Sequence, residues 1–465
     1  MHRAWFLAPL LVVAAAGSCF LRSGPTTPSP MATIPAPTTP LAPGTMAGSF
    51  FGINEALSVP AALVARRLVS GEQQRVELEA DGRDVVALGA RIVRANSHTY
   101  PFFNHFQYSR SPEASQARAD RYFEVLTAAG VEMVAVIGPW PGIQTANYTS
   151  SYPPEDMDAY IEFVERIVER YDGDGEDDAF EGMTGVTAWE IDNEPDLHNR
   201  VKPRGDKRGI DPATFQTADE YAAVFLATAA AIRRADPDAL ILSAGMYNVR
   251  APAGEAYLEA FLSTEGVMEA IDGLALHCYS DDNSLEALTQ TMAIGARMAP
   301  GKPLWITETG VASSGKHRWQ SEDWQAQMVV AMHAAALIGG VERLFWHTLA
   351  DPPSRGGGRS MPFAHHSLMQ TNHSTWEDGD SPARLNKPAG EAYRRLSAHL
   401  AAVARSEIDE IPAEGGRLMK AGDGLLAFWG TPILPDGDWV IEDLKTGALL
   451  DSAVAPAWIT AQVGE

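Results

Sequence analysis

Two glutamates each stand at the end of an apolar run, where a carboxylate is placed to do chemistry. Glu194 closes the stretch Trp-Glu-Ile-Asp-Asn-Glu, directly after Asn193, and Pro195 prevents a strand from continuing. Glu308 closes a second apolar run at residues 304–308. Cleavage of a glycosidic bond needs two carboxyl groups held together. A pair of strand-end glutamates from distant parts of the chain therefore predicts this chemistry.

The elements that would position these glutamates alternate regularly along the chain. Apolar runs of strand length are expected at 50–54, 85–93, 131–137, 186–191, 240–244, 273–279, 304–308 and 344–348. Helical spacing of apolar residues is expected at 114–129, 155–171, 221–234, 256–270, 285–298, 324–338 and 389–404. Strands that are apolar throughout fit a parallel sheet covered by helices, and eight such strands close a (β/α)8 TIM barrel. The predicted fold class is therefore α/β.

Functional side chains of such a barrel lie at the carboxyl ends of its strands. Five residues of suitable type fall there in this sequence: Arg94, Glu194, Tyr279, Glu308 and Trp346. The residue types that could do chemistry therefore fall at the end of the barrel where this fold places its functional side chains.

Four parts are expected along the chain: a leader at 1–19, a Pro/Thr-rich linker at 20–48, the barrel at 49–404 and a small β-rich appendage at 405–465. The apolar run at 4–17 is too short to span a bilayer and is typical of a signal segment. Ala16-Gly17-Ser18-Cys19 resembles a bacterial lipobox, in which Cys19 is lipidated; ordinary cleavage near residues 14–16 is the alternative. Both interpretations predict export, as an envelope lipoprotein or a secreted protein.

Composition excludes several partners. The formal net charge of −24 disfavours nucleic acid and anionic membrane surfaces, so membrane contact is expected only through a lipid anchor at Cys19. The second cysteine, Cys278, lies in an expected buried strand, so a disulfide is not expected. No Cys/His spacing matches a zinc site, and no cofactor is expected.

Four motifs in order resemble a known group of enzymes: Asn193-Glu194-Pro195, His277-x-Tyr279, Thr307-Glu308-Thr309-Gly310 and Phe345-Trp346. They are similar to the large clan of retaining (β/α)8 glycoside hydrolases, including cellulase-like and uronidase-like members, that carry Asn-Glu after strand four and Glu on strand seven. The resemblance covers roughly residues 50–404. It departs at strand three, where members often have a His and this chain has Gly138-Pro139-Trp140.

The resemblance implies roles for the site residues. Glu194 would be the general acid/base and Glu308 the nucleophile, acting on a poly- or oligosaccharide by double displacement. Asn193 would bind the sugar 2-hydroxyl, and Arg94 and Tyr279 would hold Glu308. The remaining substrate-binding candidates are His277, Trp140 and Trp346, the last as the floor of a sugar subsite.

Elementary electrostatics supports the same division of roles. A guanidinium and a tyrosine hydroxyl beside Glu308 would lower its pKa, so that it is ionised and able to attack. The charge of Glu308, together with partial burial, would raise the pKa of Glu194, so that it is protonated at the start.

Alternatives to these assignments are open at this point. The barrel could bind carbohydrate without turnover, or use a metal held by histidines among His98, His277, His347, His365 and His366. Strand-end histidines beside two carboxylates more often hydrogen-bond sugar hydroxyls, however, and their spacing here is not diagnostic of a metal site. Tyr279 and Trp346 could be core residues, and Arg94 could be a structural ion pair.

Three further segments suggest a sugar preference, a calcium site and a wall of the substrate cleft. The basic loop with Arg200, Lys202, Arg204, Lys207 and Arg208 would favour an anionic sugar such as a uronate, unless its charges pair locally. The acidic loop at 172–178 resembles an incomplete calcium loop. The loop at 351–387, with Trp376, is expected to shape the substrate cleft.

Overall fold

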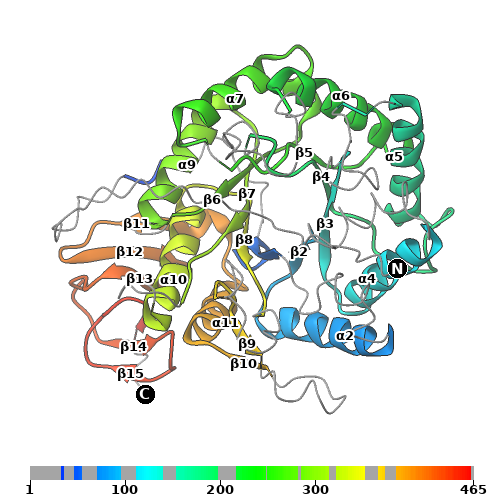
Figure 1. Cartoon of the computed structure of the whole chain (residues 1–465). Helices are drawn as coiled ribbons and strands as arrows, with labels where there is room; N and C mark the ends of the chain where they lie inside the picture. The colour runs from blue at the N-terminus through cyan, green and yellow to red at the C-terminus, as the bar shows by residue number, and fades with distance from the viewer. Residues whose placement is uncertain are drawn as a thin grey trace, which may run out of the picture.

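The computed structural model describes residues 33–35, 47–54, 71–95, 112–139, 153–154, 156–196, 216–247, 249–280, 284–313, 321–350, 365–371 and 384–461. Eight parallel strands form one sheet in the order β5-β4-β3-β2-β1-β8-β7-β6 (Figure 1). They are β1 (Phe51–Asn54), β2 (Ile92–Arg94), β3 (Glu132–Ile137), β4 (Ala188–Ile191), β5 (Ile241–Leu242), β6 (Leu274–Cys278), β7 (Leu304–Thr309) and β8 (Arg343–His347). Single parallel bridges, Leu242 to Gly273 and Met246 to Leu276, join β5 to β6. The sheet therefore closes, and the predicted (β/α)8 barrel is confirmed.

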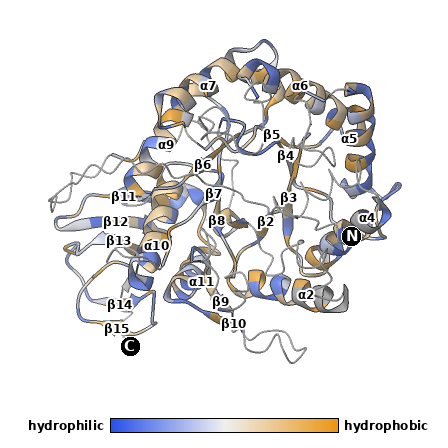
Figure 2. Cartoon of the chain, viewed as in Figure 1, coloured by the Kyte–Doolittle hydropathy of each residue, from blue (hydrophilic) through white to orange (hydrophobic). Residues whose placement is uncertain are grey.

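Helices surround this sheet, and each mixes hydrophobic and hydrophilic residues (Figure 2). They are α2 (Gly71–Ala87), α4 (Pro112–Ala128), α5 (Met157–Tyr171), α6 (Ala218–Ala235), α7 (Pro252–Ser263), α8 (Val267–Ala270), α9 (Ser284–Met298), α10 (Glu322–Ile338) and α11 (Pro388–Leu400). The start of α6 is fixed by a capping box, in which the Thr217 and Glu220 side chains each accept a hydrogen bond from the other's backbone N–H. No helix among these described elements is long and apolar enough to cross a membrane.

Several boundaries differ from the sequence-based expectations, most of them by one to four residues at an element's end. Helix α2 was not expected, and its last turn takes in residues 85–87, which had been assigned to the second strand. The helix expected at 256–270 is two helices, because Gly266 adopts a left-handed backbone (φ +87°) that interrupts it. Helix α11 ends at Leu400 rather than at 404. Local apolar spacing alone does not locate such breaks.

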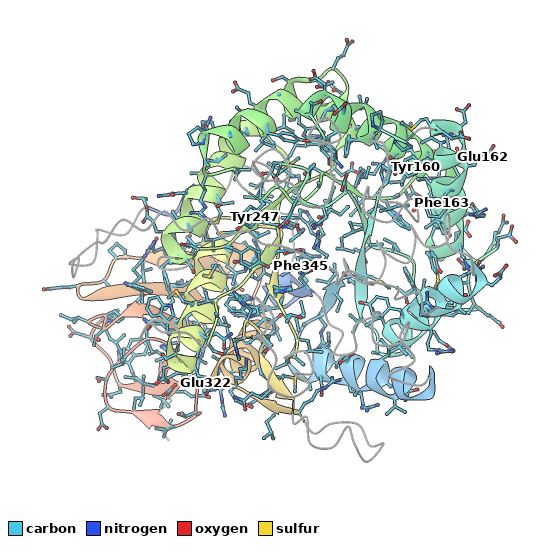
Figure 3. The ribbon with its side chains drawn as sticks, in the orientation of Figure 1. Tyr160, Glu162, Phe163, Tyr247, Glu322 and Phe345 are labelled. Atoms are coloured by element: carbon cyan, nitrogen blue, oxygen red, sulfur yellow. The ribbon has the colours of Figure 1, made fainter. Side chains whose placement is uncertain are left out.

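One layer of small and large apolar side chains fills the barrel interior. Seven strands contribute Ile92, Val134, Ala188, Leu242, Ala275, Trp305 and Phe345. The eighth strand contributes Gly52, whose missing side chain leaves room for Phe345; a Cβ there would lie 2.6 Å from the phenyl ring. Figure 3 shows Phe345 inside the ring of strands, whereas Glu162 lies on the outer helix α5. This apolar layer forms the floor of the barrel interior, below the carboxyl ends of the strands.

The C-terminal part of the chain forms a six-stranded antiparallel sheet in the order β11-β12-β13-β16-β14-β15. Its strands are β11 (Ile408–Ile411), β12 (Gly416–Ala421), β13 (Gly424–Gly430), β14 (Trp439–Asp443), β15 (Leu449–Leu450) and β16 (Ala457–Ala461), and β11 was not expected. The sheet lies beside α10 and α11 (Figure 1). Trp429 packs edge-on against Trp324 of α10, and Trp458 stacks on His399 of α11 at 4.5 Å. The β-rich appendage is thus confirmed.

A buried histidine links β1 to the helices behind it. His333 on α10 is fully buried, stacks on Phe51 at 5.1 Å and meets Tyr393 edge-on. Its Nδ1 lies 2.6 Å from the carbonyl oxygen of Val329. Burial lowers the pKa of His333 to about 4, below the ordinary value of 6.5. The folded protein therefore holds this ring neutral where an unfolded chain would protonate it.

Stability is therefore expected to fall as the pH drops from about 6.5 toward 4. The unfolded state binds a proton at His333 in this window and the folded state does not, so the free energy of unfolding should fall by up to roughly 3 kcal/mol. Urea unfolding of the parent and of His333→Phe, between pH 7 and 4.5, measures this. The variant should lose that part of the pH slope; equal slopes for both proteins would contradict the assignment.

Several expected features lie outside the described residues. These are the leader with Cys19, nearly all of the linker, the basic loop from Arg200 to Arg208, and the residues Trp140, His98 and Trp376.

Candidate active site

Polar side chains occupy the strand positions two residues beyond the apolar floor. Residues two apart on a strand share a face. The positions that follow Gly52, Ile92, Ala188, Ala275 and Phe345 in this way are Asn54, Arg94, Glu190, His277 and His347. The carboxyl end of the barrel is thus lined by a polar layer, which consists of these five residues and Glu308.

Glu308 enters this layer through an irregularity in β7. Leu276 pairs with Ile306, but the next residue of β6, His277, pairs with Glu308, so Thr307 is skipped. A bulge of this kind re-aims a side chain and is frequent next to active sites. Strict alternation from Trp305 would place Thr307 on the interior face instead.

Arg94 is the hub of the polar layer. It is fully buried and donates five hydrogen bonds, the number of N–H groups on a guanidinium. Two go to Glu190, at 2.8 and 2.5 Å, and one goes to Glu308 Oε1 at 2.7 Å. The others go to Asn54 Oδ1 at 3.0 Å and Asn193 Oδ1 at 2.8 Å. Arg94 therefore fixes side chains from three other strands and from the segment after β4.

Glu308 is held as a carboxylate. Its Oε2 accepts a hydrogen bond from the Tyr279 hydroxyl at 3.0 Å, while its Oε1 faces Arg94. Burial by itself raises the pKa of Glu308, but the charges of His277, Arg94 and His347 and the hydrogen bond from Tyr279 outweigh burial and leave the pKa well below its usual range.

Glu194 lies just beyond β4 in a strained backbone. Asp192 (φ +73°) and Glu194 (φ +51°) both adopt left-handed conformations, which non-glycine residues rarely do. The strain is supported locally. The Asp192 carboxylate accepts from the Asn193 N–H at 2.7 Å and from Gln216 at 3.0 Å, and the Glu194 N–H donates to the Gly245 carbonyl at 3.2 Å. Burial, with the nearby charges of Glu308 and Asp196, raises the pKa of Glu194.

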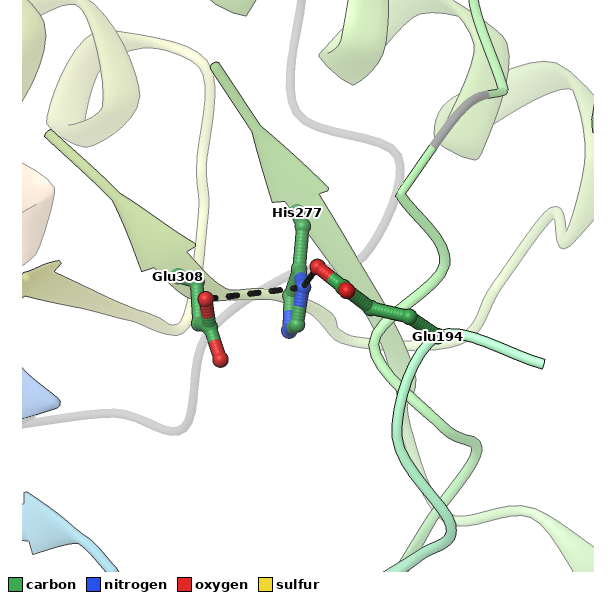
Figure 4. A group of neighbouring side chains, drawn as sticks. All are labelled: Glu194, His277 and Glu308. Carbon is green, nitrogen blue, oxygen red and sulfur yellow. Dashed lines mark hydrogen bonds and ion pairs between the residues drawn. The ribbon is translucent and has the colours of Figure 1, made fainter. Parts of the chain in front are cut away.

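His277 lies between the two glutamates (Figure 4). Its Nδ1 is 2.8 Å from Glu194 Oε1 and 3.8 Å from Glu308 Oε2. One oxygen of each glutamate and one ring nitrogen of His277 all lie within 4.8 Å of one another. The two carboxyl groups thus lie close together, although their pKa values are shifted in opposite directions.

The His277 ring packs directly on a glycine. A Cβ at Gly245 would lie 2.0 Å from His277 Nε2, and the ring is buried, so Gly245→Ala must displace it. Displacement by about 1 Å should lower kcat/KM on an aryl glycoside by roughly 100-fold. The matched control is Gly82→Ala in α2, where the nearest atom would lie at 3.3 Å. If Gly245→Ala kept the parent's kcat/KM, the ring would not be needed in this place.

Two substrate-binding predictions are corrected by these positions. Trp346 was expected to floor a sugar subsite, but its side chain is fully buried, lies over His333 at 6.2 Å and donates to the His366 carbonyl. It points to the helices because neighbouring residues of a strand face opposite sides, and the mouth receives His347 instead. His277 is 1% exposed and contacts the glutamates, so it has almost no surface for a sugar. The core alternative therefore holds for Trp346 but not for Tyr279.

Two members of the polar layer, Asn54 and Glu190, were not predicted from the sequence, and His347 was considered only among the candidate histidines. A signal existed in each case, because each lies two residues after an interior position. This two-residue spacing can be used for prediction only when the residues on the interior face of each strand are known.

Two clusters of described residues bring ligand atoms within 4.8 Å: Glu194 with His277 and Glu308, and Asp172 with Asp174 and Asp178. In the first, Arg94 already holds a positive charge 2.7 Å from Glu308, which disfavours a second cation there. In the second, Asp178 accepts from the Gly173 and Gly175 N–H groups, and Asp172 from that of Asp174. The calcium loop stays a prediction that a thermal shift with calcium would test.

Comparison with known sequences gives a partial family match. Residues 92–281 match the model of glycoside hydrolase family 44, a segment that contains Arg94, Glu194 and Tyr279 but ends before Glu308. The segment is less than half of the 465 residues, so no single family is assigned. The sequence matches no curated protein.

Solved structures agree with the barrel. A GH39 β-xylosidase from Caulobacter crescentus has a TM-score of 0.51 at 18% identity, over 88% of this chain and 80% of that one. A glucosidase from Croceicoccus marinus has a TM-score of 0.52 at 15% identity, and the match covers 91% of this chain and 84% of that one. An exo-β-1,4-mannosidase from an Opitutaceae bacterium has a TM-score of 0.52 at 14% identity, and the match covers 75% of this chain and 59% of that one. At these identities the likeness concerns the fold.

The chain is a (β/α)8-barrel glycosidase. The predicted resemblance to the large clan of such enzymes is thereby confirmed. The similar structures carry the names of xylosidase, glucosidase and mannosidase, so the fold does not select the sugar.

Proposed function

We propose that this glycosidase hydrolyses O-glycosidic bonds of a poly- or oligosaccharide with retention of anomeric configuration. Glu308 is the nucleophile, Glu194 the general acid/base, and Asn193 binds the sugar beside them. The mechanism needs no cofactor.

The distance between the two carboxylates carries this proposal. An oxygen of Glu194 and an oxygen of Glu308 lie within 4.8 Å. Retaining enzymes hold their carboxyl groups about 5–5.5 Å apart, whereas inverting enzymes leave about 6.5–9.5 Å for a water. The opposite pKa shifts support the same division, because one group must start ionised and the other protonated.

The reaction takes two steps on these residues. In the first, a Glu308 oxygen bonds to the anomeric carbon as the glycosidic bond breaks, and Glu194 gives its proton to the leaving oxygen. In the second, Glu194 takes a proton from water, whose oxygen attacks the anomeric carbon and releases Glu308. Arg94 and Tyr279 orient Glu308 throughout, since each donates to one of its oxygens.

The experiment is hydrolysis of a panel of neutral and uronic aryl glycosides and polysaccharides, followed by NMR of the first-formed sugar. Release of the β-anomer from a β-glycoside is expected, and release of the α-anomer would overturn retention. The substrate that turns over names the sugar. Neutralising the five basic residues from Arg200 to Arg208 tests the anionic-sugar alternative, because a uronate substrate should then lose more kcat/KM than a neutral one. Sugar binding without turnover would favour the binding-module alternative.

Activity is expected to persist after dialysis against a strong chelator. Arg94 occupies the place beside Glu308 that a catalytic metal would need. kcat/KM of chelated and untreated enzyme should agree within error. Loss that is restored by one divalent metal would instead support the metal-dependent alternative.

We also propose that the protein is exported and anchored by lipid at Cys19. The support is the apolar run at 4–17 and the lipobox-like stretch that ends at Cys19. Mass spectrometry of the mature N-terminus tests this, with Cys19→Ser as the control that should partition out of the detergent phase. A mature chain cleaved near residue 16 without lipid would favour secretion.

A further inference from the structure

The hydrogen-bonded ladder between β4 and β5 is interrupted just before the segment that carries the general acid/base. The two strands are parallel, and the Trp189 N–H donates to the Leu240 carbonyl at 2.8 Å. In a parallel ladder every second residue of a strand bonds to the same neighbouring strand, at even spacing. Continuing this register by two residues would bring the Ala244 N–H to the Ile191 carbonyl.

The Tyr221 hydroxyl occupies the place of that bond. It lies 2.8 Å from the Ala244 nitrogen and 2.9 Å from the Ile191 carbonyl oxygen. A backbone N–H can only donate and a carbonyl can only accept, so the hydroxyl accepts from Ala244 and donates to Ile191. Burial raises the pKa of Tyr221, so the proton needed for the second bond is retained. A side chain thus bridges the two strands where their backbones would otherwise meet.

Helix α6, which lies outside β4 and β5, holds the phenol in this place (Figure 1). The Tyr221 ring is fully buried and lies 4.6 Å from the ring of Phe261. Tyr221 belongs to the first turns of α6, whose start is fixed by the capping box at Thr217. The residue before that cap, Gln216, donates to the Asp192 carboxylate at 3.0 Å. The beginning of α6 therefore contacts two consecutive residues where β4 ends.

Beyond the hydroxyl, the backbone leaves the regular ladder. The next regular bond would join the Asn193 N–H to the Ala244 carbonyl. The Asn193 N–H instead donates to the Asp192 carboxylate at 2.7 Å. The Glu194 N–H then donates to the Gly245 carbonyl at 3.2 Å. The ladder is thus out of step by one residue where it reaches Glu194.

We propose that Tyr221 is a positioning residue for the acid/base: its hydroxyl, inserted between β4 and β5, sets the place of Glu194 relative to Glu308. The inference rests on the proposed retaining mechanism and adds a buried residue to it. Buried backbone groups that lose a partner seek another, because leaving them unpaired is costly. Without the hydroxyl the Ala244 N–H would close directly onto the Ile191 carbonyl, and Glu194 would move with the end of β4.

Tyr221→Phe keeps the ring and removes only the hydroxyl. For a glycoside with an alkyl or sugar leaving group, kcat/KM should fall by roughly 10- to 100-fold, because a displacement of about 1 Å weakens proton transfer from Glu194. A dinitrophenyl leaving group departs without a proton, so the rate of its first step should stay close to that of the parent. Equal losses on both leaving groups would overturn the proposal, and so would parental kcat/KM on both.

The matched control is Tyr393→Phe. Tyr393 on α11 is also fully buried, and its hydroxyl donates to the Gly52 carbonyl of β1 at 3.2 Å. Both variants remove a buried hydroxyl from a strand carbonyl, so they should lower Tm by similar amounts. Only Tyr221→Phe should change the ratio of kcat/KM for the two leaving groups. The same change in Tyr393→Phe would mean that loss of any such hydroxyl suffices, and would overturn the specific role of Tyr221.

Crystal structures give a readout that does not depend on activity. In the parent, a direct bond between the Ala244 N–H and the Ile191 carbonyl would overturn the proposal without any variant. In Tyr221→Phe these two atoms should approach to about 3 Å with a displaced Glu194, and an unmoved Glu194 would overturn it. If Glu194→Gln itself showed no dependence on the leaving group, the proposed function would fail instead, so the two failures are distinguishable.

Discussion

Replacing Glu308 by Gln is expected to lower kcat by at least about 10⁴-fold on every glycoside. An amide of the same shape cannot form the glycosyl ester, so the first step has no nucleophile. The fold should survive, because Arg94 keeps its paired hydrogen bonds to Glu190 and the amide oxygen can still face the guanidinium. Steady-state hydrolysis of an activated aryl glycoside measures the effect.

The matched control is Glu162→Gln. Glu162 is exposed on helix α5, far from the barrel mouth (Figure 3). It should keep parental kcat, and both variants should unfold within a few degrees of the parent. A folded Glu308→Gln variant with parental activity would remove Glu308 from the mechanism.

The effect of Glu194→Gln is expected to depend on the leaving group. For an alkyl or sugar leaving group, which needs a proton, kcat/KM should fall by roughly 10²- to 10⁴-fold. For a dinitrophenyl leaving group, which needs none, the first step should be nearly unchanged and the second slow. Stopped-flow measurements should then show a burst of phenolate followed by a slow steady state.

Azide gives this prediction a second readout. A small anion needs no general base, so it should restore turnover of the dinitrophenyl glycoside by Glu194→Gln and form a β-glycosyl azide from a β-glycoside. The same azide should not rescue Glu308→Gln. Equal loss on all leaving groups without rescue would contradict the acid/base assignment.

The pH profile follows from the same two pKa shifts. Glu308 must be ionised, and its pKa is lowered, so the acid limb of kcat/KM should lie below the ordinary glutamate value of 4.5. Glu194 must be protonated, and its pKa is raised, so the alkaline limb should lie above 4.5. In Glu194→Gln the alkaline limb should disappear while the acid limb stays.

The barrel, and the two glutamates at its carboxyl end, could be predicted from the sequence alone. Eight apolar runs separated by helical spacing leave few ways to bury every strand, and a parallel barrel is the one that eight strands close. Pro195 stops the fourth strand locally, so Glu194 had to lie near the strand's carboxyl end. The association of Arg94 and Tyr279 with Glu308 was expected as well, because strand ends in this fold converge on one face.

Which side chains enter the site depends on contacts between strands that the sequence pattern does not show. The skipped residue in β7 moves Glu308 to the interior, and the register of β8 sends Trp346 outward and His347 inward. The left-handed backbone at Asp192 and Glu194 is supported by partners as distant in sequence as Gln216 and Gly245. A shift of one residue reverses the face of a strand side chain, and such shifts depend on pairing between strands far apart in sequence. Local sequence pattern therefore gives the elements, whereas the contacts between them choose the residues.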